Sequence, residues 1–265
     1  MKIVLGFLFA TFAAFCCLTR GGTGTGPASG DLSDAPKQRD AGVQYEAGRS
    51  DGEAARRIRE AAEQGDARAQ TSLGSLYKDE DGAARDDGMA AAWYRKAADQ
   101  GFAQAQYDLG LMYAAGRGVA QDFGEAAAWY RKAAEQGLAV AQFNLGYMYL
   151  KGRGVEQDPE QAVSWYRMAA DRGDGEAQLN LALSYESGRG VPRESVQAIE
   201  WLILAASNGV PEADKNLEKL GDRATRSQIA EARVLASSWQ RRAARVAGPI
   251  PAREQGPWML VVGGP

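Results

Sequence analysis

The chain has 265 residues and a net charge of −3, and its 45% hydrophobic and 25% charged residues are typical of a soluble globular protein. It contains no histidine, which excludes Ser-His-Asp and Cys-His catalysis and imidazole metal ligands. The slightly acidic balance gives no electrostatic footprint for nucleic acid, which is therefore not an expected partner.

Within residues 1–20, Lys2 is followed by a mostly apolar run from Ile3 to Leu18. This pattern predicts a secretory signal peptide or, alternatively, a retained membrane anchor. The only cysteines, Cys16 and Cys17, lie in the run, and lipidation of one of them is a further alternative. We expect a periplasmic or secreted protein that meets a membrane only if this segment is retained or lipidated.

Residues 21–39 are rich in Gly, Thr, Ser and Pro, which predicts a flexible linker. From residue 66 to residue 209 the chain repeats itself every 36 residues, and several residue types recur in one register. The tryptophans of this register are Trp93, Trp129, Trp165 and Trp201. The repeating units cover residues 66–101, 102–137, 138–173 and 174–209.

Each unit predicts two helices separated by a turn. In the first helix Ala105, Leu109 and Tyr113 follow one another at four-residue steps and therefore share one face. The turn at residues 116–119 (GRGV) supplies glycines for a helix end. The second helix begins after an acidic N-cap, Asp122, and carries the bulky Trp129.

A single pair of helices is too small to bury its own Trp, Tyr and Leu side chains, so neighbouring pairs must stack and bury them. The spacing thus predicts an all-α solenoid of antiparallel helix pairs. Residues 40–65 are expected to form N-terminal capping helices. Residues 210–247 are expected to form a degenerate repeat and a C-terminal capping helix with the apolar stripe Ile229, Ala232, Leu235 and Trp239. Residues 248–265 should be an irregular tail.

The phrase A-x-A-Q-x-x-L-G-x-x-Y-x-x-G-x-G-V-x-x-D-x-x-x-A-x-x-W-Y-x-x-A-A-x-x-G resembles the Sel1-like repeat, a relative of the tetratricopeptide repeat. The first unit departs from it at residues 80–83, and the fourth has Ala182 for the helix glycine and Glu194 for the capping aspartate. The resemblance implies a right-handed α/α superhelix. It also implies a non-catalytic scaffold or adaptor of the bacterial cell envelope that binds another protein or peptide.

Two local patterns suggest other chemistry. Ser75 and Lys78 match S-x-x-K, the motif of serine acylases such as β-lactamases, but no S-D-N or K-T-G follows at a usable spacing. A Ser/Lys hydrolase is kept as an alternative function. The acidic stretch at residues 79–87 fits either a solvated turn with Asp86 as an N-cap or a calcium loop. No catalytic residue, metal site or cofactor is predicted.

The side of each first helix that faces away from the core differs between units and is partly apolar. We expect it to line the concave surface and form a partner-binding groove, although the same residues could instead pack between adjacent repeats. A peptidoglycan or cell-wall glycan ligand is the alternative to a protein partner. The candidate residues are Gln104, Tyr107, Asp108, Leu111, Val140, Phe143, Asn144, Tyr147, Glu176, Leu179, Asn180 and Leu183.

Overall fold

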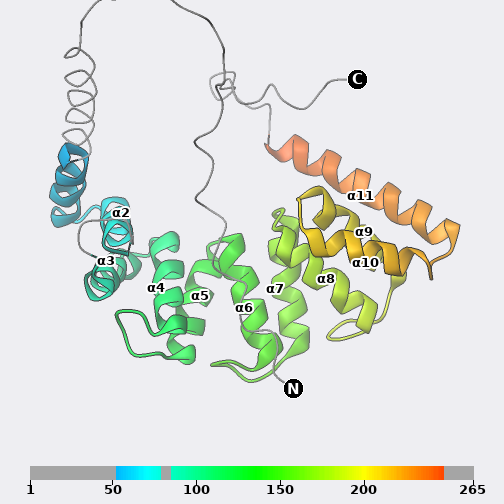
Figure 1. Cartoon of the computed structure of the whole chain (residues 1–265), viewed down its shortest axis with the longest axis horizontal. Coiled ribbons are helices and arrows are strands. Elements are labelled where there is room, and N and C mark those ends of the chain that lie inside the picture. Colours follow the sequence, from blue (N-terminus) through cyan, green and yellow to red (C-terminus); the bar gives the residue numbers. More distant parts are fainter. Residues whose placement is uncertain (1–51, 79–84, 248–265) are drawn as a thin grey trace, which may run out of the picture. The chain divides into compact units, whose positions relative to one another are not determined.

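The computed structural model describes residues 52–78 and 85–247. The expected leader, linker and irregular tail lie outside these residues, as does most of the acidic stretch after Lys78. Within the described residues the chain is helical and contains no β-strand (Figure 1). Residues 52–63 are helical and precede α2 (Ala67–Lys78), α3 (Asp87–Asp99), α4 (Ala103–Ala115), α5 (Phe123–Glu135), α6 (Ala139–Lys151), α7 (Pro159–Asp171), α8 (Gly175–Ser187), α9 (Ser195–Ser207), α10 (Pro211–Gly221) and α11 (Arg226–Ala247).

The helices pair in chain order. The closest contacts join α2 with α3, α4 with α5, α6 with α7, and α8 with α9, and each second helix then packs against the first helix of the next pair. Because a short turn joins the two helices of a pair, they run antiparallel (Figure 1). The expected fold class, an all-α solenoid, is confirmed. None of the helices in the described ranges is long and apolar enough to cross a membrane.

The ends of the helices follow from side chains at fixed places in the unit. Asp122 accepts hydrogen bonds from the backbone N–H groups of Gly124 (2.8 Å) and Glu125 (3.0 Å), and Asp158 does the same at the start of α7. These bonds satisfy donors that a helix leaves unpaired at its first turn. Glu194 stands at the same place before α9 and makes no such bond, because its side chain is one methylene longer.

The turn between the two helices of a pair also positions the pair against its predecessor. Gly116 ends α4 with a φ of 67°, and Gly118 has a φ of 66°, values that side chains disfavour. A Cβ on Gly118 would lie 1.9 Å from the backbone oxygen of Asp87, the first residue of α3. The second glycine of the turn is therefore needed for close approach to the preceding pair as well as for its own conformation.

Within a pair, a tyrosine ring covers a helix glycine. A Cβ on Gly110 of α4 would lie 2.7 Å from two ring carbons of Tyr130 of α5, and the same contact recurs at Gly74 and Gly146. In the fourth pair Leu202 replaces the tyrosine, and Ala182 replaces the glycine. The smaller aliphatic side chain leaves room for the methyl group, so the two departures from the repeat compensate for each other.

Polar side chains tie neighbouring pairs together. Buried Gln106 donates from Nε2 to the carbonyl oxygen of Ala98 at the end of α3 (3.2 Å) and accepts at Oε1 from Gln136 after α5 (2.7 Å). Arg131 of α5 donates to the hydroxyl of Tyr149 in α6 at 2.7 Å. These bonds recur from pair to pair, so the sequence repeats polar contacts as well as apolar ones.

The repeated tryptophans lie in the interfaces between pairs. Trp129 of α5 is 6% exposed and packs in one cluster with residues of α3 and α4, while Lys132 covers its ring at 3.7 Å. Trp93 and Trp201 are similarly buried, whereas Trp165 is only half-buried. At the position of Lys132 the third pair has Met168, which is 43% exposed. The expectation that neighbouring pairs shelter the indole rings thus applies most fully to three of the four.

Candidate functional site

The twelve residues proposed from sequence as a groove lie on α4, α6 and α8, the first helices of three successive pairs. Each of these helices packs against the second helix of its own pair and against the second helix of the preceding pair. The negative charges of Glu176 on α8 and Glu212 on α10 act on each other. The twelve residues, together with Glu212 and Asn216 at the equivalent places of α10, are called the first-helix face below.

Aromatic residues of the first-helix face pack against tyrosines of the core. Tyr107 lies with its ring centroid 5.7 Å from that of Tyr130, and Phe143 lies 5.8 Å from Tyr166 in the same way. Both rings are half-buried, and Leu179 is only 7% exposed. Both ring contacts join the two helices of a single pair, so the inner sides of these rings pack within their own repeat. The outer sides remain accessible, and Val140 is 39% exposed.

Asp108 is the most enclosed carboxylate of the first-helix face. Burial raises the pKa of this carboxyl, while a hydrogen bond from Gln104 (3.1 Å) and the positive charge of Lys78 on α2 act in the opposite direction. Its negative charge also contributes to the raised pKa values of Tyr94 and Tyr107, after the larger effect of burial. Asp108 thus places a charged acceptor at the base of this surface.

Two asparagines of the first-helix face are held by their own helices. The side-chain Nδ2 of Asn144 donates to the carbonyl oxygen of Val140 at 2.8 Å, and that of Asn180 donates to Glu176 at 2.9 Å. Asn216 of α10 makes the same bond to Glu212 at 2.8 Å. Sequence reasoning stopped at the fourth unit and missed Asn216, although it lies one further 36-residue step beyond Asn180.

Acidic groups gather where α8 and α10 begin. The pKa of Glu176 is raised by burial, by Glu212 and by Asp174. Burial also raises the pKa of Asp174, against the hydrogen bonds that its carboxylate accepts from the backbone of Ala177 and Glu176. The like charges of Glu176 and Glu212 make this end of the first-helix face favourable for a cation.

The S-x-x-K pair has a structural role in the described chain. The Oγ of Ser75 donates to the carbonyl oxygen of Thr71 (3.2 Å) and lies 3.0 Å from the hydroxyl of Tyr94. A nucleophilic serine needs a base within hydrogen-bond reach, and no hydrogen bond joins Ser75 to Lys78. Tyr94 is instead the partner of this serine and is itself part of the packing between α2 and α3.

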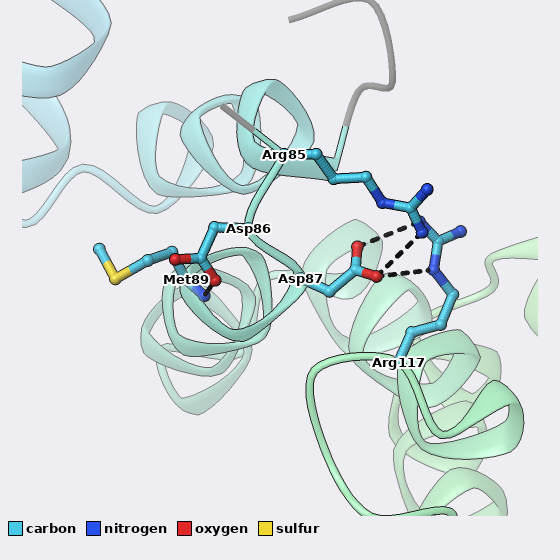
Figure 2. Close-up of polar contacts among 5 residues, drawn as sticks. All are labelled: Arg85, Asp86, Asp87, Met89 and Arg117. Carbon is cyan, nitrogen blue, oxygen red and sulfur yellow. Dashed lines mark hydrogen bonds and ion pairs between the residues drawn. The ribbon is translucent and has the colours of Figure 1, made fainter. Parts of the chain in front are cut away.

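Asp86 and Asp87, at the described end of the acidic stretch, make helix-capping and ion-pair contacts (Figure 2). Asp86 accepts from the backbone N–H of Met89 at 2.9 Å, as expected for an N-cap. Asp87 is bound by Arg117 through two hydrogen bonds (3.0 and 3.2 Å) and by Arg85 at 3.0 Å. The guanidinium of Arg117, followed by that of Arg85, lowers the pKa of the Asp87 carboxyl.

No group of three or more His, Cys, Asp or Glu side chains among the described residues is arranged to hold a metal ion. An open cleft of about 820 Å³ lies between α7 and the turn that follows α8, and its walls include Val163, Arg167, Met168 and Val191. This cleft adjoins the second helices and contains none of the twelve candidate residues.

Comparison with known families identifies the repeat. The sequence profile of the Sel1 repeat matches residues 67–102, 103–138, 139–174 and 175–210, which is more than half of the chain. The chain belongs to the Sel1 repeat family. The matched units begin one residue later than those read from the sequence spacing, and the expected family resemblance is confirmed.

Solved structures support the same assignment. One is c5321, a protective antigen of uropathogenic Escherichia coli strains with an SLR fold, at 37% identity and a TM-score of 0.64. That match covers 72% of this chain but only 41% of the antigen. A second is a Sel1 repeat protein from Oxalobacter formigenes, at 37% identity and a TM-score of 0.60, over 74% of this chain and 78% of that protein. A comparison with curated protein sequences finds no match.

Membership of the family indicates a general class of function. Sel1 repeat proteins commonly act as scaffolds that bind other proteins, and the Sel1 repeat fold is generally non-catalytic. The first-helix face combines accessible apolar area with amide and carboxylate groups.

Proposed function

We propose that this Sel1 repeat protein is a non-catalytic scaffold of the bacterial cell envelope that binds a partner protein or peptide along its first-helix face. The observation that carries the proposal is the difference between the two sides of the first helices. The core side repeats from unit to unit, whereas the exposed positions of Gln104, Val140 and Glu176 change their chemistry. A surface that varies on a constant framework is suited to recognising one particular partner.

The envelope location is supported by the sequence of residues 1–20. A lysine followed by an apolar run is typical of export signals, and cysteines are confined to that run, so the repeats themselves carry no thiol. Cell fractionation of a strain that expresses the tagged chain tests this part of the proposal. Recovery of the chain only in the cytosol would contradict it.

Crosslinking in intact cells tests the partner-binding surface. We expect the Tyr107/Phe143/Tyr147→Ala variant to lose partner crosslinks, because it removes the aromatic area of the first-helix face. Two of these rings also pack on core tyrosines, so a second variant, Val140→Glu, changes an exposed residue with less risk to folding. The matched control is Met168→Glu, which places the same charge at a similarly exposed site on α7.

The outcome also separates a protein partner from a cell-wall ligand. Loss of crosslinks in Val140→Glu but not in Met168→Glu supports the proposal. Equal crosslinking in all folded variants would contradict it. Sedimentation of the purified chain with isolated sacculi, weakened by Val140→Glu, would favour the alternative of a peptidoglycan ligand on the same surface.

A further inference from the structure

We propose that α11 lies on the surface of an anionic lipid bilayer with its exposed arginines among the headgroups, and that the apolar run at residues 258–262 adds a second contact with the same bilayer. The inference goes beyond the proposed function, because α11 contains none of the residues of the first-helix face. It is carried by an uncovered side of α11, by a row of arginines on that side and by an exposed valine beside them.

One side of α11 packs against the fold and the other is uncovered. Among the described helices, the extensive contacts of α11 are with α9, and Figure 1 shows α11 along the outside of the last pair. On the inner side Ala232 and Ala236 are buried, and Trp239 meets Trp201 of α9. Because the helix has 22 residues, its outer side presents a strip about 33 Å long to solvent.

The outer side of α11 carries Arg226, Arg233 and Arg241, called the arginine row below. All three are exposed, and spacings of seven and eight residues place them on one side of a helix. None of them forms an ion pair within the described residues. Glu231, the only acid of α11, precedes Arg233 by two residues and therefore points to a different side of the helix. The row is thus available to an anionic partner.

Arg242 differs from the arginine row. Its Nη1 donates a hydrogen bond to the Oγ of Ser238 at 3.2 Å. Its positive charge also acts on Glu200 of α9, where it opposes the rise in pKa that burial causes. Arg242 therefore lies toward α9 and is left out of the proposed contact.

The charge of α11 is opposite in sign to that of the rest of the chain. The helix contains five arginines and one glutamate and so carries +4, whereas the whole chain carries −3, which leaves −7 for the residues outside α11. Segregated charge of this kind creates a local positive potential. Clusters of basic residues bind anionic lipid headgroups, and a guanidinium suits phosphate because it can donate two parallel hydrogen bonds.

An apolar side chain accompanies the arginine row. Val234 is 66% exposed, more than any other large hydrophobic side chain of the described residues. It stands seven residues before Arg241 and so belongs to the outer side of the helix. A bilayer has an apolar layer beneath its charged headgroups, whereas a nucleic-acid backbone offers mainly phosphate charge. Exposed valine among arginines therefore favours a bilayer over a nucleic acid.

The sequence beyond α11 supplies a second element of the same kind. Residues 258–262 read WMLVV, follow the end of α11 after ten further residues and lie outside the described residues. Ten residues span up to about 35 Å, so the run is within reach of a bilayer that α11 contacts. Tryptophan is enriched at membrane interfaces. A basic surface combined with an apolar segment attaches more stably than either alone.

Photocrosslinking maps the proposed contact directly. The purified full-length chain is mixed with phosphatidylglycerol vesicles that contain a diazirine-labelled phosphatidylglycerol, and crosslinked peptides are identified by mass spectrometry. We expect crosslinks in α11 and in residues 248–265 and none in α2 to α9. Because each peptide is identified separately, binding by the N-terminal apolar run does not obscure the result. Crosslinks confined to residues before α11 would overturn the inference.

Vesicle sedimentation tests the arginine row by its preference for phosphatidylglycerol over phosphatidylcholine. This ratio of affinities is used because the N-terminal apolar run can bind both vesicles. Arg233→Gln/Arg241→Gln should lower the ratio about tenfold or more, since each basic residue near an anionic surface contributes several-fold. The matched control, Arg68→Gln/Arg193→Gln, removes the same charge from exposed sites on α2 and in the turn after α8 and should keep the ratio.

A third variant separates the two contacts. Trp258→Ser/Leu260→Ser should remove the crosslinks of residues 248–265 and leave those of α11 in place. If both sets of crosslinks persist unchanged, the apolar run is not a contact, and that part of the inference is wrong.

The remaining outcomes distinguish this inference from the proposed function. If Arg233→Gln/Arg241→Gln keeps its circular dichroism and its wild-type preference for phosphatidylglycerol, the arginine row does not bind the bilayer. If the variant instead loses affinity for a 20-base-pair DNA duplex with vesicle binding unchanged, α11 is a nucleic-acid surface. Either result overturns the lipid inference and leaves the scaffold function in place, because that function is tested on another surface by Val140→Glu.

Discussion

At the scale of single residues, the contact between Gly110 and Tyr130 explains why a helix-weakening residue recurs in the middle of the first helix. A Cβ on Gly110 would lie 2.7 Å from two ring carbons and 3.3 Å from the carbonyl oxygen of Ala126. We predict that Gly110→Ala lowers the free energy of unfolding by about 1–3 kcal/mol, because overpacking outweighs the gain in helix propensity. Urea unfolding followed by circular dichroism measures the change.

Two variants make this prediction specific. Gly221→Ala changes a helical glycine with no atom within 4 Å of the new Cβ, so it should be neutral or slightly stabilising. Gly110→Ala combined with Tyr130→Leu reproduces the Ala182 and Leu202 pair of the fourth unit. The double variant should lose less stability than the two single losses together. Strict additivity would show that ring and glycine are not coupled.

Asp87 provides a pH-dependent contribution to stability. Arg117 and Arg85 lower the pKa of its carboxyl below the ordinary value of 3.8. A lowered pKa in the folded chain stabilises it above the unfolded-state pKa, and this contribution is lost as pH falls through the folded-state value. We predict that Asp87→Asn is less stable than the wild type at pH 7 and that the difference shrinks below about pH 4.

Raised pKa values elsewhere make the comparison with Asp87→Asn necessary. The carboxyls of Asp108, Asp174 and Glu176 bind protons more readily in the folded chain, so their contribution to stability increases as pH falls. Urea unfolding of both chains at pH 7 and pH 3 cancels these shared effects. A stability difference that stays the same at both pH values would contradict the role given to Asp87.

At the scale of helices, one of the buried glutamines of the first helices lacks a hydrogen-bond donor for its side-chain oxygen. Gln70, Gln106 and Gln178 each accept a side-chain hydrogen bond at Oε1, whereas the Oε1 of Gln142 is buried without a partner. The residue at the partner's position in that pair is Arg172, which donates to the carbonyl oxygen of Met168 instead.

Supplying a hydrogen-bond donor to the Oε1 of Gln142 should stabilise the folded chain. Arg172→Gln gives the third pair the residue that the first two pairs have at this place, and we predict a gain of about 1 kcal/mol, since an unsatisfied buried acceptor costs about 1–3 kcal/mol. The matched control is Gln136→Ala, which removes the partner of Gln106 and should destabilise by a similar amount. Urea unfolding measures the free energy of unfolding of each variant. A lower value for Arg172→Gln than for the wild type would contradict the proposed cost of the unpaired Gln142 oxygen.

The helices themselves were predictable, and most of the contacts between them were not. Four-residue steps such as Ala105, Leu109 and Tyr113 indicate a helix face from local spacing alone, and Asp122 marks a helix start by its capping chemistry. The link from Arg131 to Tyr149 joins residues eighteen apart on different helices. Local periodicity has no information on such a bond, because it depends on how two pairs stack.

The first-helix face was predicted in the same partial way. The repeat register assigned the twelve residues to one side of their helices, and Val140 and Glu176 are exposed there. The register could not show that Tyr107 leans on Tyr130, because the direction of a side chain depends on the neighbouring helix. The hydrogen bond from the side chain of Asn180 to the backbone carbonyl of Glu176 likewise could be found only from the structure.

At the scale of the whole molecule, stability is expected to be distributed along the array of pairs. The extensive contacts between the described helices join each pair to its neighbours, so the free energy of unfolding is approximately a sum of terms for pairs and for interfaces. Beyond the fourth pair, α10 and α11 both pack against α9, and Trp239 of α11 meets Trp201 edge to face with their ring centroids 6.4 Å apart.

The final prediction concerns this C-terminal cap. Trp239→Ala should weaken the interface between α9 and α11 by somewhat less than the roughly 3–5 kcal/mol typical of a fully buried aromatic residue, because Trp239 is half-buried. In an array with only nearest-neighbour contacts, the loss should be local. Hydrogen exchange measured by mass spectrometry should show reduced protection in α8 to α11 and unchanged protection in α2 to α5. Val234→Ala, at a site 66% exposed on the same helix, should alter neither region. Equal loss of protection in all helices would instead show that the described pairs unfold as one cooperative unit.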